Sequence, residues 1–133
     1  ISKGLVDAKD RILELSKSSD TRILIGIVGK PGAGKSTVTA KLKEILPKEE
    51  TKILSQDGYH LSNAQLKELG RADRKGAPDT FDPKSFTELL RRVARDIEND
   101  IYFPIFHREI EESIAAEGVI TPKTKIVLVE GNY

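Results

Sequence analysis

The strongest structural signal in this chain lies in residues 22–36, which read Arg22-Ile23-Leu24-Ile25-Gly26-Ile27-Val28 and then Gly29-Lys30-Pro31-Gly32-Ala33-Gly34-Lys35-Ser36. The first segment is apolar and rich in β-branched residues, as is typical of a short strand buried on both faces of a parallel sheet. The second has the spacing of a phosphate-binding loop, in which glycines let the backbone turn its N–H groups toward phosphate oxygens. A Gly-rich surface turn is the alternative, but the strand before the loop and the helical pattern after it favour phosphate binding.

This loop predicts a site for a nucleoside triphosphate, with ATP and Mg²⁺ as the expected cofactors. We expect Lys35 to reach the β- and γ-phosphates and to stabilise charge during catalysis, and the Ser36 hydroxyl to bind the metal. The helix that begins at Lys35 adds the positive end of its dipole. The expected cofactor-binding residues are Gly29, Lys30, Pro31, Gly32, Ala33, Gly34, Lys35, Ser36 and Thr37.

The rest of the chain alternates between helical and strand patterns. Strands are expected at 22–28, 52–55 and 125–130. Helices are expected over residues 5–15, from 35 to Pro47, from Ser62 to Gly70 and after Asp82, with a helical piece after Pro104. Residues 56–60 and 71–81 are expected to be loops. The residues expected to face the core are Leu5, Ala8, Ile12 and Leu15, then Val38, Leu42, Ile45 and Leu46, then Phe86, Leu89, Leu90, Val93 and Ile97.

This order predicts an α/β fold with a parallel sheet and right-handed crossovers. The 133 residues suit one domain, residues 1–133. The chain has no Met and stops just after a core strand, so we expect it to be the N-terminal portion of a longer chain.

Composition gives no sign of nucleic-acid or membrane binding. The net charge is +1, and no apolar run approaches the roughly 18 residues of a membrane span. There is no Cys, so disulfides and thiolate metal sites are excluded. The default expectation is a cytoplasmic protein that partners small molecules, with its oligomeric state open.

Two carboxylates follow predicted strands directly. Asp57 comes after the second strand and Glu130 ends the third, so both should reach the edge of the sheet that carries the phosphate loop. A metal-bound triphosphate needs an acidic residue near the ion, and a hydroxyl acceptor benefits from a carboxylate base. The alternatives are that Asp57 is a turn residue before Gly58 and that Glu130 is a solvated loop carboxylate.

Three separated segments together resemble the phosphoribulokinase/uridine kinase family of small-molecule kinases. They are the loop Gly29 to Ser36, then Asp57-Gly58-Tyr59-His60, then Glu130-Gly131-Asn132-Tyr133. The stretch Lys75-Gly76-Ala77-Pro78-Asp79-Thr80-Phe81-Asp82 is similar to a nucleoside or nucleotide kinase-like branch, and bacterial pantothenate kinases look like more distant relatives. The resemblance covers most of the chain from Arg22 onward.

The resemblance implies a P-loop NTPase three-layer sandwich, of which about three core strands are present. It places the third strand between the other two. It implies that Asp57 activates the acceptor hydroxyl, that Glu130 lies near the metal with Ser36 and Asp57, and that His107 contacts the substrate. The family pattern continues past Tyr133 with another strand, a lid and adenine contacts.

Other polar residues have weaker claims to the substrate. His60 could hydrogen-bond a substrate hydroxyl. Arg71 and Arg74, beside Lys75, form a basic loop that either contacts substrate or phosphate or is simply solvated. His107 interrupts an apolar stretch and could equally be a structural histidine.

The leading hypothesis is a kinase that moves the γ-phosphoryl group of ATP to a hydroxyl of a small metabolite, such as a nucleoside, a sugar or a related alcohol. A nucleotide-hydrolysing switch and a non-catalytic nucleotide-binding module remain as alternatives. The identity of the acceptor is open.

Overall fold

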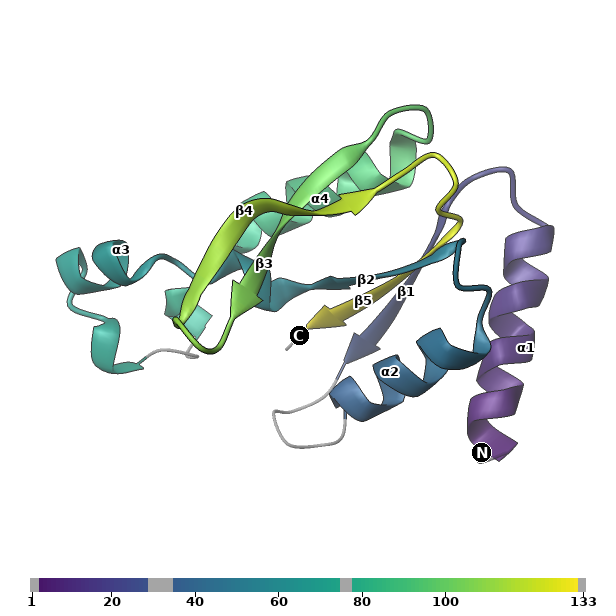
Figure 1. Ribbon diagram of the computed structural model, residues 1–133, viewed down its shortest axis with the longest axis horizontal. Helices are drawn as coiled ribbons and strands as arrows, with labels where there is room; N and C mark the ends of the chain where they lie inside the picture. The colour runs from purple at the N-terminus through teal and green to yellow at the C-terminus, as the bar shows by residue number, and fades with distance from the viewer. Residues whose placement is uncertain (1–2, 29–34, 75–77, 132–133) are drawn as a thin grey trace.

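The structure is a computed structural model that describes residues 3–28, 35–74 and 78–131. A three-stranded sheet lies between two layers (Figure 1). One layer contains the helices α1 (Lys3–Lys17) and α2 (Lys35–Ile45). The other contains the helix α4 (Pro83–Arg95) and a two-stranded hairpin. The expected three-layer α/β architecture is confirmed.

The sheet consists of β1 (Ile23–Val28), β2 (Thr51–Ser55) and β5 (Ile126–Gly131). All pairs are parallel and the order is β1-β5-β2, so the strand that comes last in sequence lies in the middle. β5 is continuously apolar up to Glu130, and its first four residues are buried, because layers cover both of its faces. The expected strands and their order are therefore confirmed.

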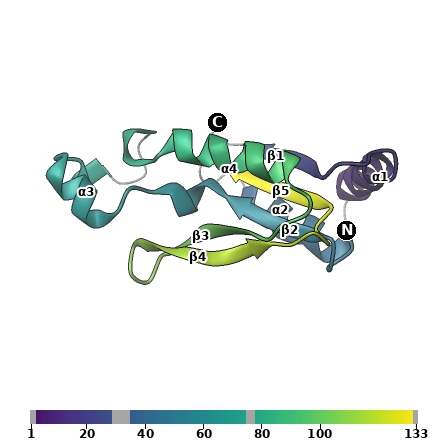
Figure 2. The same cartoon turned by 90° about the horizontal axis from the view of Figure 1, so that it is seen from above.

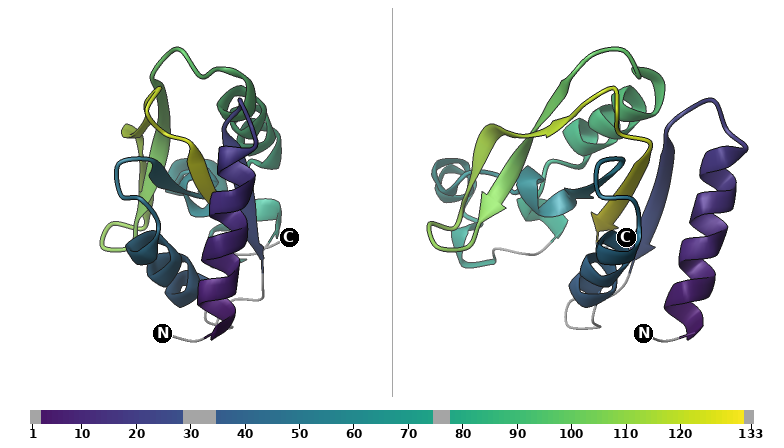
Figure 3. Two further views of the ribbon diagram at one scale, coloured as in Figure 1. Left: turned by 90° about the vertical axis from the view of Figure 1, so that its right-hand side faces the viewer. Right: turned by 45° about the vertical axis from the view of Figure 1, so that its right-hand side comes forward.

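Two apolar clusters occupy the two faces of the sheet. On one face, Ile126 and Leu128 of β5 pack with Ile12 of α1, Leu42 of α2 and Leu46, which directly follows α2. On the other, Val127 and Val129 pack with α4 and the hairpin through Phe86, Leu89, Val93, Ile101, Phe103 and Ile120. Figure 1 shows α4 and the hairpin above the sheet, Figure 2 shows them from above with the strands visible between them, and Figure 3 shows α1 beside α2. Because successive side chains of a strand point to opposite faces, Ile126 and Leu128 contact one layer and Val127 and Val129 contact the other.

Two residues expected to face the core do not. Val38 of α2 is 40% exposed and Ile97, beyond the end of α4, is 41% exposed. Leu42 lies one turn after Val38 on the same face of α2 and is buried, so the packing on this face does not extend to Val38. Ile97 lies after Asp96, where the chain has already left the helix.

The prediction of a helix after Pro104 is wrong. Residues there form β3 (Ile101–His107) and β4 (Glu112–Ile120), an antiparallel hairpin with a register shift between Phe103 and Ile105. Gly118 permits this pairing, since a Cβ at that position would lie 2.3 Å from the ring of Phe103. The spacing of Ile110 and Ile114 suggested a helix, but both side chains are exposed.

The segments expected as loops contain short 3₁₀ turns. η1 (Gln56–Tyr59) follows β2, and η2 (Ala72–Arg74) and η3 (Pro78–Thr80) flank residues 75–77, which lie outside the described residues. Between η1 and η2, α3 (Asn63–Glu68) begins after its N-cap Ser62, whose hydroxyl accepts a hydrogen bond from the Gln65 amide. Gly70 follows it at φ +69°, a left-handed conformation that glycine adopts without strain. The expected cap and end of this helix are confirmed, as is the Asp82 cap of α4.

Arg22 joins three segments at the end of the sheet remote from Glu130. Its side chain is buried and its guanidinium donates to the carbonyl oxygens of Thr124, Val93, Asp96 and Thr121, at 2.8 to 3.0 Å. Two of these carbonyls belong to the C-terminal turn of α4 and its cap, where no intrahelical donor remains. The arginine therefore fixes α4 over the sheet.

Candidate functional site

The carboxyl ends of the three strands meet around Glu130. In the register of the sheet, Glu130 lies between Ile27 of β1 and Ser55 of β2. The phosphate-binding motif follows β1 directly and α2 begins at Lys35. The half-buried Glu130 and the end of β2 thus lie at the edge where the motif leaves the sheet, as the sequence predicted.

Most of the motif itself lies outside the described residues. This holds for Gly29, Lys30, Pro31, Gly32, Ala33 and Gly34. The backbones of Lys35, Ser36 and Thr37 form the first turn of α2, and Thr37 is exposed. The expected roles of these residues therefore remain predictions, but the strand and helix that the motif requires on either side are present.

Asp57 lies in η1, two residues after the end of β2. The Ser55 hydroxyl accepts a hydrogen bond from the Asp57 amide at 3.1 Å and caps the turn. The next residue, Gly58, is buried against the hairpin, and a Cβ there would lie 2.3 Å from the carbonyl oxygen of Pro104. Local capping and this close approach together fix the backbone that carries the Asp57 carboxylate.

His60 supports the same turn. Its Nδ1 atom lies 2.7 Å from the carbonyl oxygen of Asp57, and its ring lies between those of Phe81 and Phe106, with centroids 4.2 and 4.3 Å away. The residues on either side of His60 are hydrogen-bonded to the segment before α4. The Leu61 amide donates to the Thr80 carbonyl oxygen, and the Asp82 amide donates to the Tyr59 carbonyl oxygen. His60 is therefore held next to Asp57 by residues from three segments.

A cleft of about 470 Å³ opens beside Asp57, along the outer edge of β2. The hairpin forms one wall, with Phe103, Pro104 and Phe106 from β3 and Gly118 and Val119 from β4. β2, the turn after it and α2 form the other wall, with Lys52, Ile53, Ser55, Asp57, Gly58 and Lys43. Ile105 and Glu117 complete the hairpin wall. The lining of the cleft is mostly apolar with a few charged groups, which is characteristic of a small-molecule site.

The hairpin wall of this cleft was not predicted from the sequence. A signal was present in residues 101–106, which are apolar, β-branched or aromatic around a single Pro and therefore favour a strand. The helical spacing of later isoleucines outweighed it. Lys43 and Lys52 were missed because their approach depends on the packing of α2 against β2.

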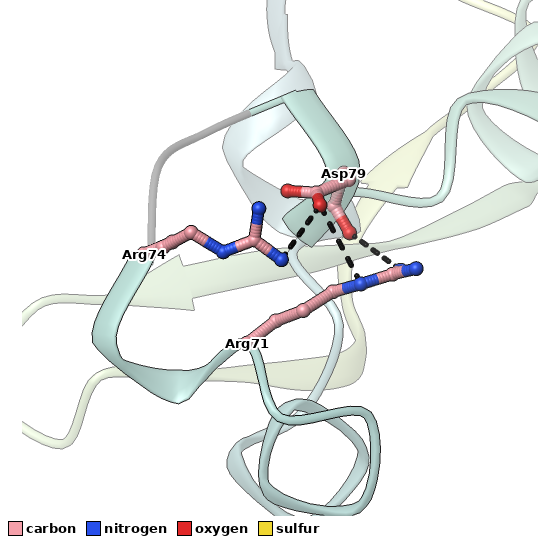
Figure 4. A network of polar contacts seen from close by, with 3 residues as sticks. All are labelled: Arg71, Arg74 and Asp79. Atoms are coloured by element: carbon pink, nitrogen blue, oxygen red, sulfur yellow. Dashed lines mark hydrogen bonds and ion pairs between the residues drawn. The ribbon is translucent and has the colours of Figure 1, made fainter.

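The two arginines of the basic loop bind a carboxylate of the chain itself (Figure 4). Arg74 Nη2 lies 2.9 Å from Asp79 Oδ2, and Arg71 Nε lies 3.5 Å from the same oxygen. Arg71 also donates to the Asp79 carbonyl at 3.1 Å. The arrangement joins η2 to η3, and a substrate role for Arg71 and Arg74 stays a prediction.

His107 lies at the end of β3, where two glutamates contact it. Its Nε2 atom is hydrogen-bonded to Glu117 of β4, and its Nδ1 atom lies 3.6 Å from Glu109. The hydrogen bond to Glu117 is the main reason that the pKa of His107 is raised above its ordinary value, and the negative charges of both glutamates add to it. Through Glu117 the histidine is linked to the cleft, while its contact with a substrate stays a prediction.

The carboxylates of Asp57 and Glu130, which follow or end neighbouring strands, are hard oxygen ligands of the kind that Mg²⁺ accepts together with substrate phosphates. Their binding of the metal together with the Ser36 hydroxyl stays a prediction. Among residues 3–28, 35–74 and 78–131, no cluster of three His, Cys, Asp or Glu side chains forms a metal cage. In the same ranges, no helix is long and apolar enough to cross a membrane.

Comparison with known proteins gives one consistent picture. Residues 24–133 match the sequence profile of the Phosphoribulokinase / Uridine kinase family. A protein of Schizosaccharomyces pombe named "Putative uridine kinase C227.14" is 36% identical over 135 residues, covering 93% of this chain and 56% of its own length. The pantothenate kinase of Lacticaseibacillus casei is 29% identical over 126 residues, covering 91% of this chain and 40% of its own length.

Solved structures agree with the sequence matches. The crystal structure of a "putative fructose transport system kinase" from Silicibacter sp. TM1040 superposes with a TM-score of 0.86 at 32% identity, covering 97% of this chain and 63% of that one. The chain thus spans between two fifths and two thirds of the length of these three relatives.

Proposed function

Because the chain belongs to the phosphoribulokinase/uridine kinase family, we propose that it is the nucleotide- and acceptor-binding part of an ATP-dependent kinase that phosphorylates a hydroxyl of a small metabolite. The observation that carries this proposal is the arrangement at the strand ends. Asp57 follows β2, which pairs with β5 at Glu130, and β5 also pairs with β1, the strand that leads into the phosphate motif. A cleft opens next to Asp57. A phosphoryl donor and a hydroxyl acceptor would therefore meet at one edge of the sheet.

In this proposal the chain positions the reactants and stabilises charge. Lys35 and the amides of the loop hold the phosphates, and Lys35 offsets the charge that spreads over the oxygens of the transferred group. Ser36, Glu130 and Asp57 would hold Mg²⁺, which neutralises phosphate charge when it is bound. Asp57 accepts the proton of the acceptor hydroxyl, and the His60 contact keeps its backbone in place.

The cleft beside Asp57 is the proposed acceptor site. Its apolar hairpin wall would limit the access of water to the reacting hydroxyl, and His60 packs against Phe106 of that wall. His60, His107, Arg71 and Arg74 are proposed to contact the acceptor once it is bound. For Arg71 and Arg74 this requires that Asp79 share or release them.

The proposed setting is the cytoplasm, where ATP is available and thiols stay reduced. The absence of Cys from the sequence fits such a compartment. A nucleoside triphosphate and a small hydroxylated metabolite are the proposed partners.

Measurement of ADP release by the intact protein tests the proposal. ATP and Mg²⁺ are supplied with and without a panel of hydroxylated metabolites, including uridine, pantothenate and fructose. We expect release that depends on one class of acceptor. Release that no acceptor accelerates would instead indicate a nucleotide-hydrolysing switch, and binding of ATP without turnover would indicate a non-catalytic module.

A further inference from the structure

Two lysines in the cleft have no part in the transfer of a phosphoryl group to a hydroxyl. Lys43 comes from the C-terminal half of α2 and Lys52 from the start of β2, and both line the same cleft as Asp57. Both are half-buried. The fold brings them together because α2 returns along the sheet and packs on β2.

Neither lysine has a counter-charge among the described residues. Among the described residues, no carboxylate forms an ion pair with Lys43 or Lys52. Two ammonium groups that line one cleft without a counter-charge repel each other. A bound anion would remove this repulsion.

The carboxylates in the cleft do not serve this purpose. Glu117 is hydrogen-bonded to His107, which offsets its charge when the imidazole is protonated. Asp57 lies past the opposite end of β2. Lys52 and Ser55 are three strand residues apart, which places their Cα atoms about 10 Å from each other. The cleft therefore has a carboxylate end and a cationic end.

We propose that the acceptor carries an anionic group, phosphate or carboxylate, at the end remote from its reacting hydroxyl, and that Lys43 and Lys52 bind that group. This rests on the proposed function, because Asp57 defines the reacting end. Two ammonium charges match a dianionic phosphomonoester, which lysine binds as a point charge. A sugar phosphate is comparable in length with the distance between the two ends.

An NMR titration of the ¹⁵N-labelled full-length protein tests the anion site without turnover. The protein is loaded with ADP to fill the phosphate loop, and glycerol 3-phosphate, glycerate and glycerol are added separately. The amide signals of Gly118 and Val119, which line the cleft, report binding. We expect saturable shifts with an anion and none with glycerol at the same concentrations. The anion with the lower dissociation constant, glycerol 3-phosphate or glycerate, shows whether the site prefers phosphate or carboxylate.

The Lys43→Met/Lys52→Met variant should raise the dissociation constant of the anion about tenfold or more, because the interaction with charged donors is lost while the side-chain volume is kept. Lys41→Met is the matched control, since Lys41 is an exposed residue of α2 that does not line the cleft. The single variants Lys43→Met and Lys52→Met serve if the double variant does not fold. An unchanged dissociation constant, or equal binding of glycerol, would overturn the inference. Failure of ADP to bind would count against the proposed function alone. Binding of the anions can still be measured without nucleotide from the amide signals of Gly118 and Val119.

Discussion

The Nδ1 atom of His60 lies 2.7 Å from the backbone carbonyl oxygen of Asp57. The histidine thus contacts the main chain of the candidate base, and its ring is held by Phe81 and Phe106. With the Ser55 cap on the other side of the turn, the backbone of Asp57 is fixed by contacts from both directions. A base held in this way needs little reorganisation when an acceptor binds.

Replacement of Asp57 by Asn in the intact protein should lower the rate of phosphoryl transfer by roughly 10²–10⁴-fold, the range for a positioned acid–base group. The amide keeps the shape of the carboxylate but cannot accept the hydroxyl proton. ATP affinity should change little, because Lys35, Ser36 and the loop amides are expected to hold the phosphates.

Steady-state kinetics of this variant at two Mg²⁺ concentrations separates the possible roles. A rate that extra Mg²⁺ partly restores would indicate that Asp57 mainly serves the metal. Near-normal activity with altered stability would show that Asp57 is only a turn residue before Gly58.

Replacement of Lys35 by Ala should abolish measurable binding or turnover of the nucleoside triphosphate. The motif assigns this lysine to the β- and γ-phosphates, and no other residue of the motif except Lys30 carries a positive charge. Calorimetric titration with ATP measures the effect, and circular dichroism checks that the variant is folded. A folded variant with unchanged affinity would contradict the assignment of the loop.

Replacement of Gly58 by Ala should lower the free energy of unfolding by about 1–3 kcal/mol, as overpacking typically does. The new Cβ would lie 2.3 Å from the backbone oxygen of Pro104, and neither backbone can move away cheaply. Because Asp57 precedes it, turnover should fall as well.

Gly26→Ala is the matched control, measured by urea unfolding alongside Gly58→Ala. Gly26 lies in β1 and a Cβ there would meet no atom within 4 Å. The free energy of unfolding of the Gly26→Ala variant should be unchanged or slightly increased, since alanine reduces the conformational freedom of the unfolded chain. Equal losses in the two variants would disprove the close approach at Gly58.

The contact between His107 and Glu117 should make the hairpin sensitive to pH. The pKa of His107 is raised above 6.5, mainly by the hydrogen bond to Glu117, so folding favours the protonated imidazole. The contribution to stability is fully present below pH 6.5 and is lost as the pH rises through the folded-state pKa. An NMR titration of the His107 ring should show this pKa, and Glu117→Gln should move it back toward 6.5. A titration that is the same in both proteins would rule out the contact.

Much of the fold follows from signals that act over a few residues. The strand before the phosphate motif, the caps Ser62 and Asp82, and the glycine after α3 were all predicted, because each depends on neighbouring backbone groups. The meeting of Glu130 with the end of β2 was also predicted, because parallel strands present their carboxyl ends at one edge.

The hairpin could not be predicted in this way. Its sequence contains both a strand pattern in residues 101–106 and isoleucines at helical spacing. The fit of Gly118 against the ring of Phe103 supports the strand, and that contact joins residues far apart in the sequence. Val38 and Ile97 were also predicted to face the core but are exposed, because the packing on α2 does not extend to Val38 and the chain has left α4 before Ile97.

By itself, the sequence determined the phosphate motif, the elements on either side of it and the carboxylates that follow the strands, because these are local patterns of turn, cap and periodicity. Only the tertiary structure decided the burial of Arg22, which bonds carbonyl oxygens 71 to 102 residues away, and the cleft in which Lys43 and Lys52 lie with Asp57. The physical reason is that burial and charge environment depend on which distant segments cover a side chain, and only packing sets that.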